Sequence, residues 1–275
     1  MYLINGIEVS KDNFNTPIES LSFRRGDGIF EAIRIHNGFL FAVDRHLKRF
    51  ERSANKMLFK NIDFNSIKKD LIKLASNFTE GYVRVIISRS ETVESYDVYM
   101  FHQKPVDIPE NYSLQTQLSP WHPGGDFLLE ENQIIGTKST SYALNVTQTR
   151  LAEQNGFTDA LLLNRNNIIL EGPTFSLGWI KDDTVYIPDL DLGILDSITR
   201  QYINLFGAKG QLNVIESRIT ADEIYEMDTV FVLSTAKHGK FVNKIDEKVY
   251  EQSPVLKLIQ ECFIEEIEAE KQINN

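Results

Sequence analysis

The sequence predicts an α+β protein of two domains, because of its length, its hairpin signals and the order of its strands and helices. The chain has 275 residues, which suits two domains of about 100–150 residues better than one. Strand-like runs joined by short turns are followed by amphipathic helices, and strands and helices do not alternate regularly. This order favours mixed sheets with segregated helices over a doubly wound parallel sheet.

Two Asn-Gly pairs indicate hairpins in the first part of the chain. Asn5-Gly6 lies between YLI and IEV, and Asn37-Gly38 lies between FEAIRI and FLFAV. Both central residues of such a turn need a positive φ, which asparagine and glycine adopt readily. The runs YVRVIISRS and SYDVYMFH are expected to be further strands.

Two amphipathic helices are predicted after these hairpins, over residues 44–59 and 64–78. Apolar residues recur at helical spacing in both, and Asp44 suits the N-cap of the first. Arg49 shares a flank of the first helix with His46 and Ser53. A solvated charged edge is the default interpretation of that flank.

Residues 119–127 (SPWHPGGDF) concentrate proline and glycine and show no periodicity. We therefore expect a small N-terminal domain over 1–118, a linker over 119–127 and a larger C-terminal domain over 128–275. The elements expected in the second domain are a helix ending at Gly156, a hairpin of DALLLN with NIILEG, strands FSLGWI and TVYIP joined at Asp182-Asp183, helix SITRQYINLFG, strand LNVIESRI, short helix ADEIYEM, strand DTVFVLS and a long closing helix.

The composition argues against several classes of protein. The net charge is −10 and Lys and Arg are scattered, whereas nonspecific nucleic-acid binding needs a basic surface. The single cysteine, Cys262, cannot form an intrachain disulfide, which fits a reducing compartment. We see no signal peptide and no apolar run near the ~20 residues of a membrane span. We expect a cytoplasmic protein that binds neither membrane nor nucleic acid, and no metal site, because the five histidines lack ligand spacing.

Lys138 and Glu171 lie in unusual local sequences. Lys138 stands in IIGTKSTSYALNV, between apolar residues and small hydroxyl residues, although most lysines lie on charged helix faces. Glu171 directly follows an apolar strand in NIILEGPTF. Taken alone, Lys138 reads more readily as a surface lysine, and Glu171 equally well as a turn residue. A partly dry amine and a nearby acid are nevertheless two groups that a pyridoxal-phosphate (PLP) site requires.

A third requirement of such a site is a place for phosphate. Asp196 and Ser197 in LGILDSITRQYI are N-cap residue types, so the amides of Ile198 and Thr199 would face outward at a helix start, a geometry that suits anions. Most capped helices bind nothing, and this alternative stays open. The pair formed by Ser234 and Thr235 follows the strand DTVFVL, where hydroxyls could line a cleft or form an ordinary turn.

Seven stretches, in this order, resemble the fold-type IV PLP enzymes, the class IV aminotransferase family. They are RRGDGIFEAIRIHNG, DRHLKRFERSA, YVRVIISR, KSTSY, NGFTDALLLN with ILEG, LGILDSITR and VFVLSTA, and they span nearly the whole chain. The resemblance implies two α/β domains with PLP at the domain interface, and usually a homodimer. The family includes branched-chain and D-amino-acid aminotransferases, (R)-selective amine transaminases and aminodeoxychorismate lyases.

The resemblance also implies roles for residues that contact the cofactor ring. Lys138 would form the Schiff base with PLP and carry the proton during catalysis. Tyr142 would hydrogen-bond the 3′ oxygen of the ring, and Glu171 would pair with the pyridine nitrogen.

Further roles implied by the resemblance concern phosphate and substrate. The groups that would hold the phosphate are Arg49, the backbone of Ile198 and Thr199, Ser234 and Thr235. Arg84 stands where branched-chain enzymes place an arginine near the substrate carboxylate, a charge-assisted contact. Arg34, in FEAIRI, is a second candidate, although both arginines could instead form structural ion pairs.

Departures from the family pattern leave the subfamily open. Serine stands at 90, 141, 176 and 234, where members often have Gly, Asn, Asn and Gly. The leading hypothesis is transfer of an amino group between an amino acid or amine and a 2-oxo acid. The runner-up is an aminodeoxychorismate lyase that forms 4-aminobenzoate and pyruvate, and a third possibility is a non-catalytic PLP-binding relative.

Overall fold

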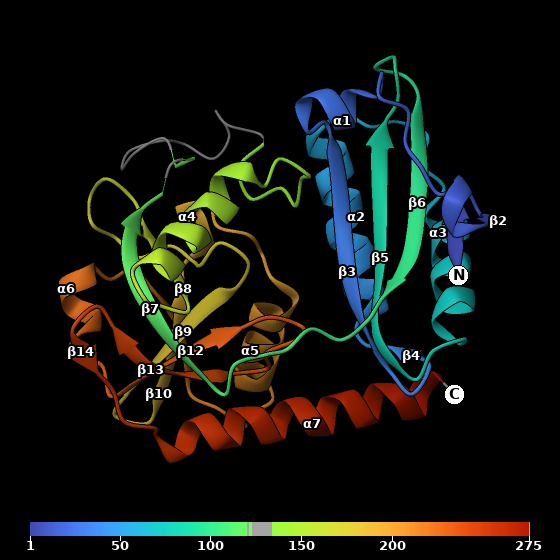
Figure 1. Cartoon of the computed structure of the whole chain (residues 1–275). Coiled ribbons are helices and arrows are strands. Elements are labelled where there is room, and N and C mark those ends of the chain that lie inside the picture. Colours follow the sequence, from blue (N-terminus) through green and yellow to red (C-terminus); the bar gives the residue numbers. More distant parts are fainter. Residues whose placement is uncertain (120, 123–133, 275) are drawn as a thin grey trace. The chain divides into compact units, whose positions relative to one another are not determined.

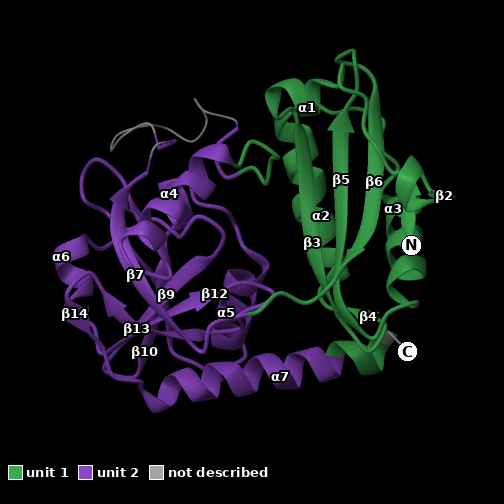
Figure 2. Cartoon of the chain, in the orientation of Figure 1, with its two compact units in different colours: residues 1–107, 137–142, 270–275 green, residues 108–136, 143–269 purple. Residues whose placement is uncertain are grey.

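The structure is a computed structural model that describes residues 1–119, 121–122 and 134–274. The chain divides into two compact units, which Figure 2 colours separately and whose elements Figure 1 labels. Unit 1 comprises residues 1–107, 137–142 and 270–275, and unit 2 comprises 108–136 and 143–269. Most of the linker predicted at 119–127 lies outside the described residues, and 108–118 belong to unit 2. The short segment 137–142, with Lys138, belongs to unit 1 although unit 2 residues flank it.

Unit 1 contains an antiparallel sheet with the strand order β2-β1-β6-β5-β3-β4. The strands are β1 (Tyr2–Ile4), β2 (Ile7–Val9), β3 (Gly28–His36), β4 (Phe39–Leu40), β5 (Glu80–Arg89) and β6 (Tyr96–Gln103). Asn5 and Asn37, both at φ 51°, turn the chain between β1 and β2 and between β3 and β4. Both predicted Asn-Gly hairpins are therefore confirmed.

Helices α2 (Val43–Lys56) and α3 (Phe64–Ala75) pack their apolar stripes against one face of this sheet. The core between them includes Ile33, Leu47 and Phe50, each at most 9% exposed. Burial of each such side chain stabilises the fold by about 1.5–3 kcal/mol. The unit also contains the short helices η1 (Lys11–Asn13) and α1 (Leu21–Arg25).

Two details of α2 differ from the sequence prediction. Ala42 is the N-cap residue, in left-handed conformation at φ 58°, and Asp44 lies in the first turn and pairs with Lys68. The flank with His46, Arg49 and Ser53 is buried, so its interpretation as a solvated edge was wrong. The reason is that a partner on β3, described below, neutralises the buried charge.

Unit 2 contains a mixed sheet with the order β11-β10-β9-β12-β13-β7-β8, with β14 beside β13. Its strands are β7 (Asn111–Leu118), β8 (Asp159–Leu163), β9 (Ser176–Lys181), β10 (Thr184–Pro188), β11 (Val214–Ser217), β12 (Thr229–Leu233), β13 (Lys240–Ile245) and β14 (Lys248–Val249). β7 pairs in parallel with both β8 and β13, which explains why 111–118 belong to this unit. Residues 168–171 pair with 162–164 through one isolated bridge, Leu163 with Ile169, and through three backbone hydrogen bonds, and they form no full strand.

The central strands β9 and β12 of unit 2 are buried along nearly their whole length. The helices of the unit are α4 (Ala143–Gln154), η3 (Leu190–Leu192), α5 (Ile198–Ala208), α6 (Ala221–Ile224) and most of α7 (Pro254–Asn274). Asp182 and Asp183, at φ 47° and 61°, form the predicted turn between β9 and β10. Among the described residues, no helix is both long enough and apolar enough to cross a bilayer.

Candidate functional site

The segment that carries Lys138 runs along the free edge of β3 in unit 1. The Phe30 amide donates to the Lys138 carbonyl oxygen at 3.1 Å, and the Thr140 amide donates to the Gly28 carbonyl oxygen at 2.8 Å. Ile29 and Ser139 form an antiparallel bridge between these two bonds. The backbone around Lys138 is therefore fixed by strand pairing as well as by its own turn.

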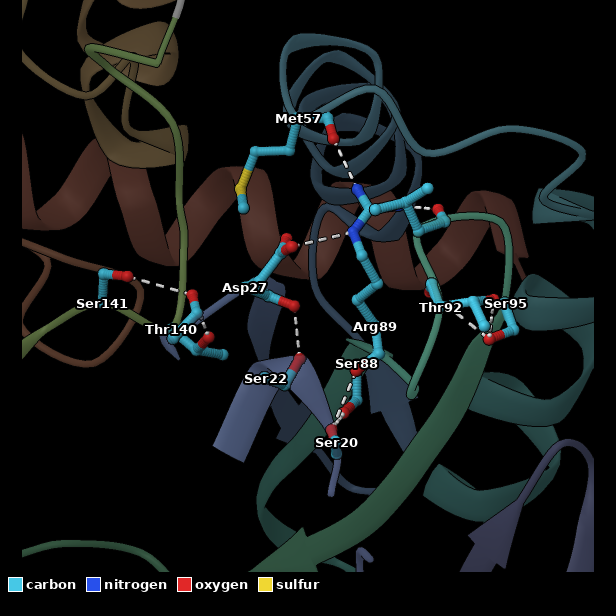
Figure 3. Close-up of polar contacts among 12 residues, drawn as sticks. Ser20, Ser22, Asp27, Met57, Ser88, Arg89, Thr92, Ser95, Thr140 and Ser141 are labelled. Atoms are coloured by element: carbon cyan, nitrogen blue, oxygen red, sulfur yellow. Dashed lines mark hydrogen bonds and ion pairs between the residues drawn. The ribbon is translucent and has the colours of Figure 1, made fainter. Parts of the chain in front are cut away.

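The turn that precedes β3 anchors the same segment. The hydroxyls of Thr140 and Ser141 both donate to the Gly26 carbonyl oxygen at 2.9 Å (Figure 3). Gly26 has a φ of 69°, and a Cβ there would lie 2.4 Å from the Ser141 hydroxyl oxygen. Only glycine fits this position, because it tolerates both the left-handed backbone and the close approach.

Arg89, at the end of β5, holds the residue after Gly26. Its Nε lies 3.0 Å from a carboxylate oxygen of Asp27, and its Nη2 donates to the Met57 carbonyl oxygen at 2.6 Å (Figure 3). Arg89 is 5% exposed. This pair of a buried arginine and a half-buried aspartate ties the Gly26 turn to β5, and Arg89 also bonds the backbone that follows α2, so the pair supports the Lys138 segment indirectly.

The Lys138 amine is half-buried among aromatic groups of unit 1. Its Nζ donates to the Tyr142 hydroxyl at 3.4 Å and lies 4.4 Å from the centre of the Phe30 ring. The Phe30 and Tyr142 rings contact each other edge to face, with centroids 5.3 Å apart. The amine thus lies beside a phenol and against a ring, and no carboxylate among the described residues forms an ion pair with it.

Arg49 belongs to a buried polar cluster of three side chains, hereafter the Glu31 cluster (Glu31, His46, Arg49). Arg49 Nε and Nη2 donate to the two carboxylate oxygens of Glu31, both at 2.7 Å, and His46 Nδ1 lies 2.8 Å from the second oxygen. Glu31, His46 and Arg49 are 1%, 1% and 6% exposed. α2 supplies the histidine and the arginine, and β3 supplies the carboxylate from its helix-covered face.

The ionisation of the Glu31 cluster follows from these contacts. Burial alone would raise the pKa of Glu31, but Arg49 and His46 together hold it well below its usual range, so the carboxylate is ionised. Burial lowers the pKa of His46, although the Glu31 carboxylate opposes this shift. An ionised carboxylate only accepts hydrogen bonds, so the Nδ1 of His46 carries a proton and donates it. The cluster is therefore one anion, one cation and one neutral imidazole.

Arg84 and Arg34 lie on the sheet face of unit 1 opposite to α2 and α3. Arg84 is half-buried, donates from Nε to the Gln103 side chain at 2.7 Å and lies over the Phe30 ring. Arg34 forms an ion pair with Glu80. The ion pair favours the structural interpretation of Arg34, whereas Arg84 shares the Phe30 ring with Lys138.

A cavity of about 280 Å³ opens in unit 1 beside the Lys138 segment, with Thr140 in its lining. The other lining residues are apolar or carry hydroxyl or amide groups: Phe14, Asn15, Thr16, Ser22, Phe23, Ile86, Ser88 and Tyr99. This lining, taken over the described residues, contains no charged side chain. The space suits an uncharged group better than a carboxylate or an ammonium.

Glu171 lies at the start of a tight turn in unit 2, next to the N-terminal end of α5. The Leu195 amide donates to both carboxylate oxygens of Glu171, at 3.3 and 3.4 Å. Leu195 lies two residues before the N-cap Ser197. The backbone that leads into α5 therefore holds the half-buried carboxylate in place.

Ser197 caps α5, as its residue type predicted. Its hydroxyl accepts the Arg200 amide at 3.1 Å. The amides of Ile198 and Thr199 lie in the first turn of α5, where no carbonyl oxygen of the helix can accept from them, so they depend on partners outside the helix. Amides at a helix start, with the positive end of the helix dipole, favour an anion.

Ser234 and Thr235 form a tight turn after β12. The Ser234 carbonyl oxygen accepts the amides of Lys237 and His238, at 2.9 and 3.1 Å. The half-buried Lys237 places its Nζ 4.3 Å from the centre of the Phe175 ring and 4.7 Å from that of Tyr112. Phe175 belongs to the turn after Glu171, so Lys237 joins two turns that carry candidate residues.

Replacement of Lys237 by methionine should change how stability depends on pH. Burial lowers the pKa of the Lys237 amine from 10.5 to about 8. Between pH 8 and 10.5 the unfolded chain holds a proton that the folded chain lacks, so stability rises with pH in this window. Urea unfolding should show a native-minus-variant difference in unfolding free energy that is flat below pH 8 and increases above it. Lys257→Met, at a 77% exposed side chain, should give no such slope. A flat difference for Lys237→Met would contradict the assignment.

The predicted site residues divide between the two units. Unit 1 contains Arg34, Arg49, Arg84, Lys138 and Tyr142, and unit 2 contains Glu171, Ile198, Thr199, Ser234 and Thr235. Within unit 1, Lys138 and Tyr142 are in contact, and the Lys138 amide also donates to Ser53 Oγ on α2 at 3.3 Å. Within unit 2, the Glu171 carboxylate and the start of α5 are neighbours.

Sequence reasoning missed Glu31, Leu195 and Lys237. The signal for Glu31 was available, because it occupies an inward position of the alternating strand FEAIRI, where a carboxylate needs a buried partner. No local pattern marks Leu195 or Lys237, since one acts through its backbone and the other through rings distant in sequence.

Comparison with known proteins identifies the family to which the chain belongs. A family model described as class IV amino-transferase matches residues 28–245. A D-alanine aminotransferase of Bacillus licheniformis is 25% identical over 252 residues, which cover 89% of this chain and 88% of the relative. One from Staphylococcus aureus (strain MSSA476) is 25% identical over 278 residues, 97% of each chain.

Solved structures show the same fold. A branched-chain aminotransferase from Thermoproteus uzoniensis matches with a TM-score of 0.86 and 20% identity, over 96% of this chain and 93% of that one. The PLP-bound form of a hypothetical aminotransferase from Mycobacterium tuberculosis matches with a TM-score of 0.87 and 18% identity, over 98% and 99%. The fold is that of the fold-type IV PLP-dependent enzymes.

The chain belongs to the class IV aminotransferase family, and it is a PLP-dependent aminotransferase whose substrates are amino acids and keto acids. The residues present fit the cofactor chemically. They offer an amine beside a phenol, a carboxylate held by an amide, a capped helix start and a buried guanidinium. His46 Nε2 is a further buried polar atom for which the described residues provide no hydrogen-bond partner.

Proposed function

We propose that this enzyme moves an amino group between an α-amino acid and a 2-oxo acid, with Lys138 as the lysine that binds PLP. The observation that carries the proposal is the setting of the Lys138 amine: it donates to the Tyr142 hydroxyl, lies against the Phe30 ring and is fixed by strand pairing with β3. An amine held in a fixed place is what attack on the aldehyde of the cofactor requires.

The chain's own residues would divide the work as follows. When bound, PLP supplies the electron sink that lets the Cα–H bond of the substrate break. Lys138 Nζ would take that proton and return it, and the Tyr142 hydroxyl would orient the amine. Glu171 would keep the ring nitrogen protonated, because a carboxylate favours the charged form of a nearby base. Its contact with the Leu195 amide supports this role, since it fixes the acid.

The phosphate would be held by a guanidinium, two backbone amides and two hydroxyl groups. The proposed ligands are Arg49, the amides of Ile198 and Thr199, and the hydroxyls of Ser234 and Thr235. The cap at Ser197 supports the role of the two amides. Arg84 would bind the substrate carboxylate through a charge-assisted contact. We further propose that the enzyme acts in the cytoplasm and that it forms a homodimer. Light scattering of the purified chain tests the homodimer.

A half-reaction screen tests the proposed function. The PLP-loaded protein is mixed with single amino acids and the loss of its visible absorbance is followed. The panel is D- and L-alanine, D- and L-leucine, D- and L-glutamate and an (R)-amine, so that it covers both configurations and small, apolar and acidic donors. Alanine is included because curated relatives are D-alanine aminotransferases. At least one donor should bleach the absorbance, and a 2-oxo acid should restore it. Absence of bleaching with every donor, combined with release of 4-aminobenzoate from aminodeoxychorismate, would identify a lyase instead.

Replacement of Arg49 by glutamine should weaken binding of PLP by about 1.5–3 kcal/mol, as expected for a hydrogen bond to a charged group. The affinity for pyridoxal, which has the aldehyde but no phosphate, should change little. Absorbance titration of the apo-protein with each compound gives both constants. An unchanged PLP affinity in this variant would assign the phosphate to other residues.

A further inference from the structure

The Glu31 cluster is costly to bury and is not needed to fill the core of unit 1. Its three side chains are at most 6% exposed and lie among apolar neighbours such as Ile33 and Phe50. Removing two charges from water costs several kcal/mol for each ion, and apolar side chains of similar volume often replace such a pair without loss of stability. A buried ion pair at this place therefore points to a task other than stability.

The geometry of the Glu31 cluster restricts the Arg49 guanidinium to one plane. Two parallel N–H···O bonds of 2.7 Å join Nε and Nη2 to the two oxygens of Glu31. A guanidinium has five N–H groups in a rigid fork, so fixing one edge also fixes the direction of the remaining three. Recognition of a phosphate by arginine depends on this planar geometry.

His46 supports the carboxylate from the second side. Its Nδ1 donates to the Glu31 oxygen that also accepts from Arg49 Nη2, so the carboxylate is held by two residues one turn apart on α2. The charged groups that act on His46 are Glu31, Arg49 and Lys138. The Lys138 amide is bonded to Ser53, the next turn of the same helix. α2 thus fixes the guanidinium and the backbone of the candidate catalytic lysine together.

We propose that Glu31 and His46 are positioning residues that hold the Arg49 guanidinium in the orientation from which it binds the phosphate of the cofactor. The inference rests on the proposed role of Arg49. A positioning role and simple charge attraction predict opposite effects on phosphate binding when Glu31 is replaced. Removal of the negative charge of Glu31 would strengthen phosphate binding if only electrostatic attraction mattered, whereas loss of a fixed guanidinium weakens it.

The ratio of PLP affinity to pyridoxal affinity isolates the phosphate contribution. The ratio is to be measured by titration of the apo-protein for the native chain, Glu31→Gln, Arg49→Gln and the double variant. Glu31→Gln should lower the ratio roughly tenfold, with pyridoxal affinity within about twofold of native. In the Arg49→Gln background the same change should have no further effect, because Glu31 acts only through Arg49.

Two variants of His46 test the same claim without a change at the ion pair. His46→Asn keeps an N–H donor near the position of Nδ1 and should retain most of the ratio, whereas His46→Leu removes the donor and should lower it several-fold. Asp27→Asn is the matched control, because it also replaces a carboxylate that faces a buried arginine, Arg89. It should lower the thermal midpoint but leave the ratio at its native value.

Each outcome decides the proposal. An unchanged or higher ratio in Glu31→Gln overturns it, and so does an equal ratio in His46→Asn and His46→Leu. If Glu31→Gln does not fold, the histidine pair decides alone. If Arg49→Gln keeps the native ratio, the role of Arg49 in phosphate binding fails and the positioning role fails with it. If Arg49→Gln loses the ratio but Glu31→Gln keeps it, only the positioning role fails.

Discussion

Replacement of Lys138 by alanine is expected to reduce transamination by roughly 10³-fold or more and to abolish the absorbance band that comes from the Schiff base between the lysine and the cofactor. The variant loses both the amine that bonds the aldehyde and the group that carries the substrate proton, and proton transfer by a placed side chain alone contributes about 10²–10⁴-fold. Steady-state rates and absorbance spectra of the two proteins provide the measurement. Tyr142 and Phe30 remain in place, so PLP should still bind, more weakly and without the covalent bond.

Two controls separate loss of the amine from loss of the fold. Lys138→Arg keeps a long basic side chain against the Phe30 ring but offers no nucleophile, so it should be as inactive as the alanine variant. An added small amine such as methylamine should restore part of the activity of Lys138→Ala, because it can replace the missing base in the space that the side chain leaves. Native turnover in either variant would show that another lysine carries the cofactor.

Replacement of Glu171 by glutamine is expected to slow proton removal from the substrate by on the order of 10²-fold or more, comparable with the loss of one preorganised electrostatic contact. The amide has the same size and can still accept from the Leu195 amide, but it cannot hold a proton on the ring nitrogen. An unprotonated ring is a poorer acceptor of the electrons of the Cα–H bond. Single-turnover measurement with a donor amino acid isolates this step.

The affinity for PLP distinguishes the two ways in which Glu171 could matter. If the carboxylate acts on the ring nitrogen, Glu171→Gln should retain PLP affinity within about tenfold while the single-turnover rate falls far more. Glu171→Asp keeps an acid on a shorter side chain and should give an intermediate rate. Equal rates in the native enzyme and in Glu171→Gln would remove the residue from the chemistry and leave it a turn residue.

Local signals in the sequence predicted much of the fold. The Asn5 and Asn37 turns, the turn at Asp182 and Asp183 and the cap at Ser197 were predictable because each depends on the φ preference or the hydroxyl of the residue itself. The amphipathic helices in unit 1 were predictable for a different local reason, because apolar residues at helical spacing define one face of each helix.

Features set by distant pairing were not predictable in this way. β7 pairs in parallel with both β8 and β13. Parallel strands are not linked by a short turn, so no turn residues in the sequence predict this pairing. Likewise, residues 137–142 complete the edge of β3 more than 100 residues earlier in the chain, through Phe30 and Gly28. The resemblance to a family located Lys138, but its local sequence gave no sign of the strand that holds it.

The Glu31 cluster illustrates the same limit at the level of side chains. Arg49 and His46 were visible as helix neighbours, and a solvated edge was the reasonable default because charges seldom lie in a core. The third member of the cluster lies on β3, 15 residues before His46, and only its presence makes burial of the guanidinium possible. Burial of a charged side chain depends on a partner elsewhere in the fold, and helical periodicity alone cannot predict that partner.

The site of covalent attachment can be measured directly. Borohydride reduction of the PLP-loaded native enzyme, followed by digestion and mass spectrometry, locates the lysine that bonds the cofactor. A pyridoxyl group on the peptide that contains Lys138, in near-stoichiometric yield, is the result expected from the setting of this amine. A label on a different lysine, such as Lys237, whose pKa burial lowers to about 8, with Lys138 unmodified, would contradict it.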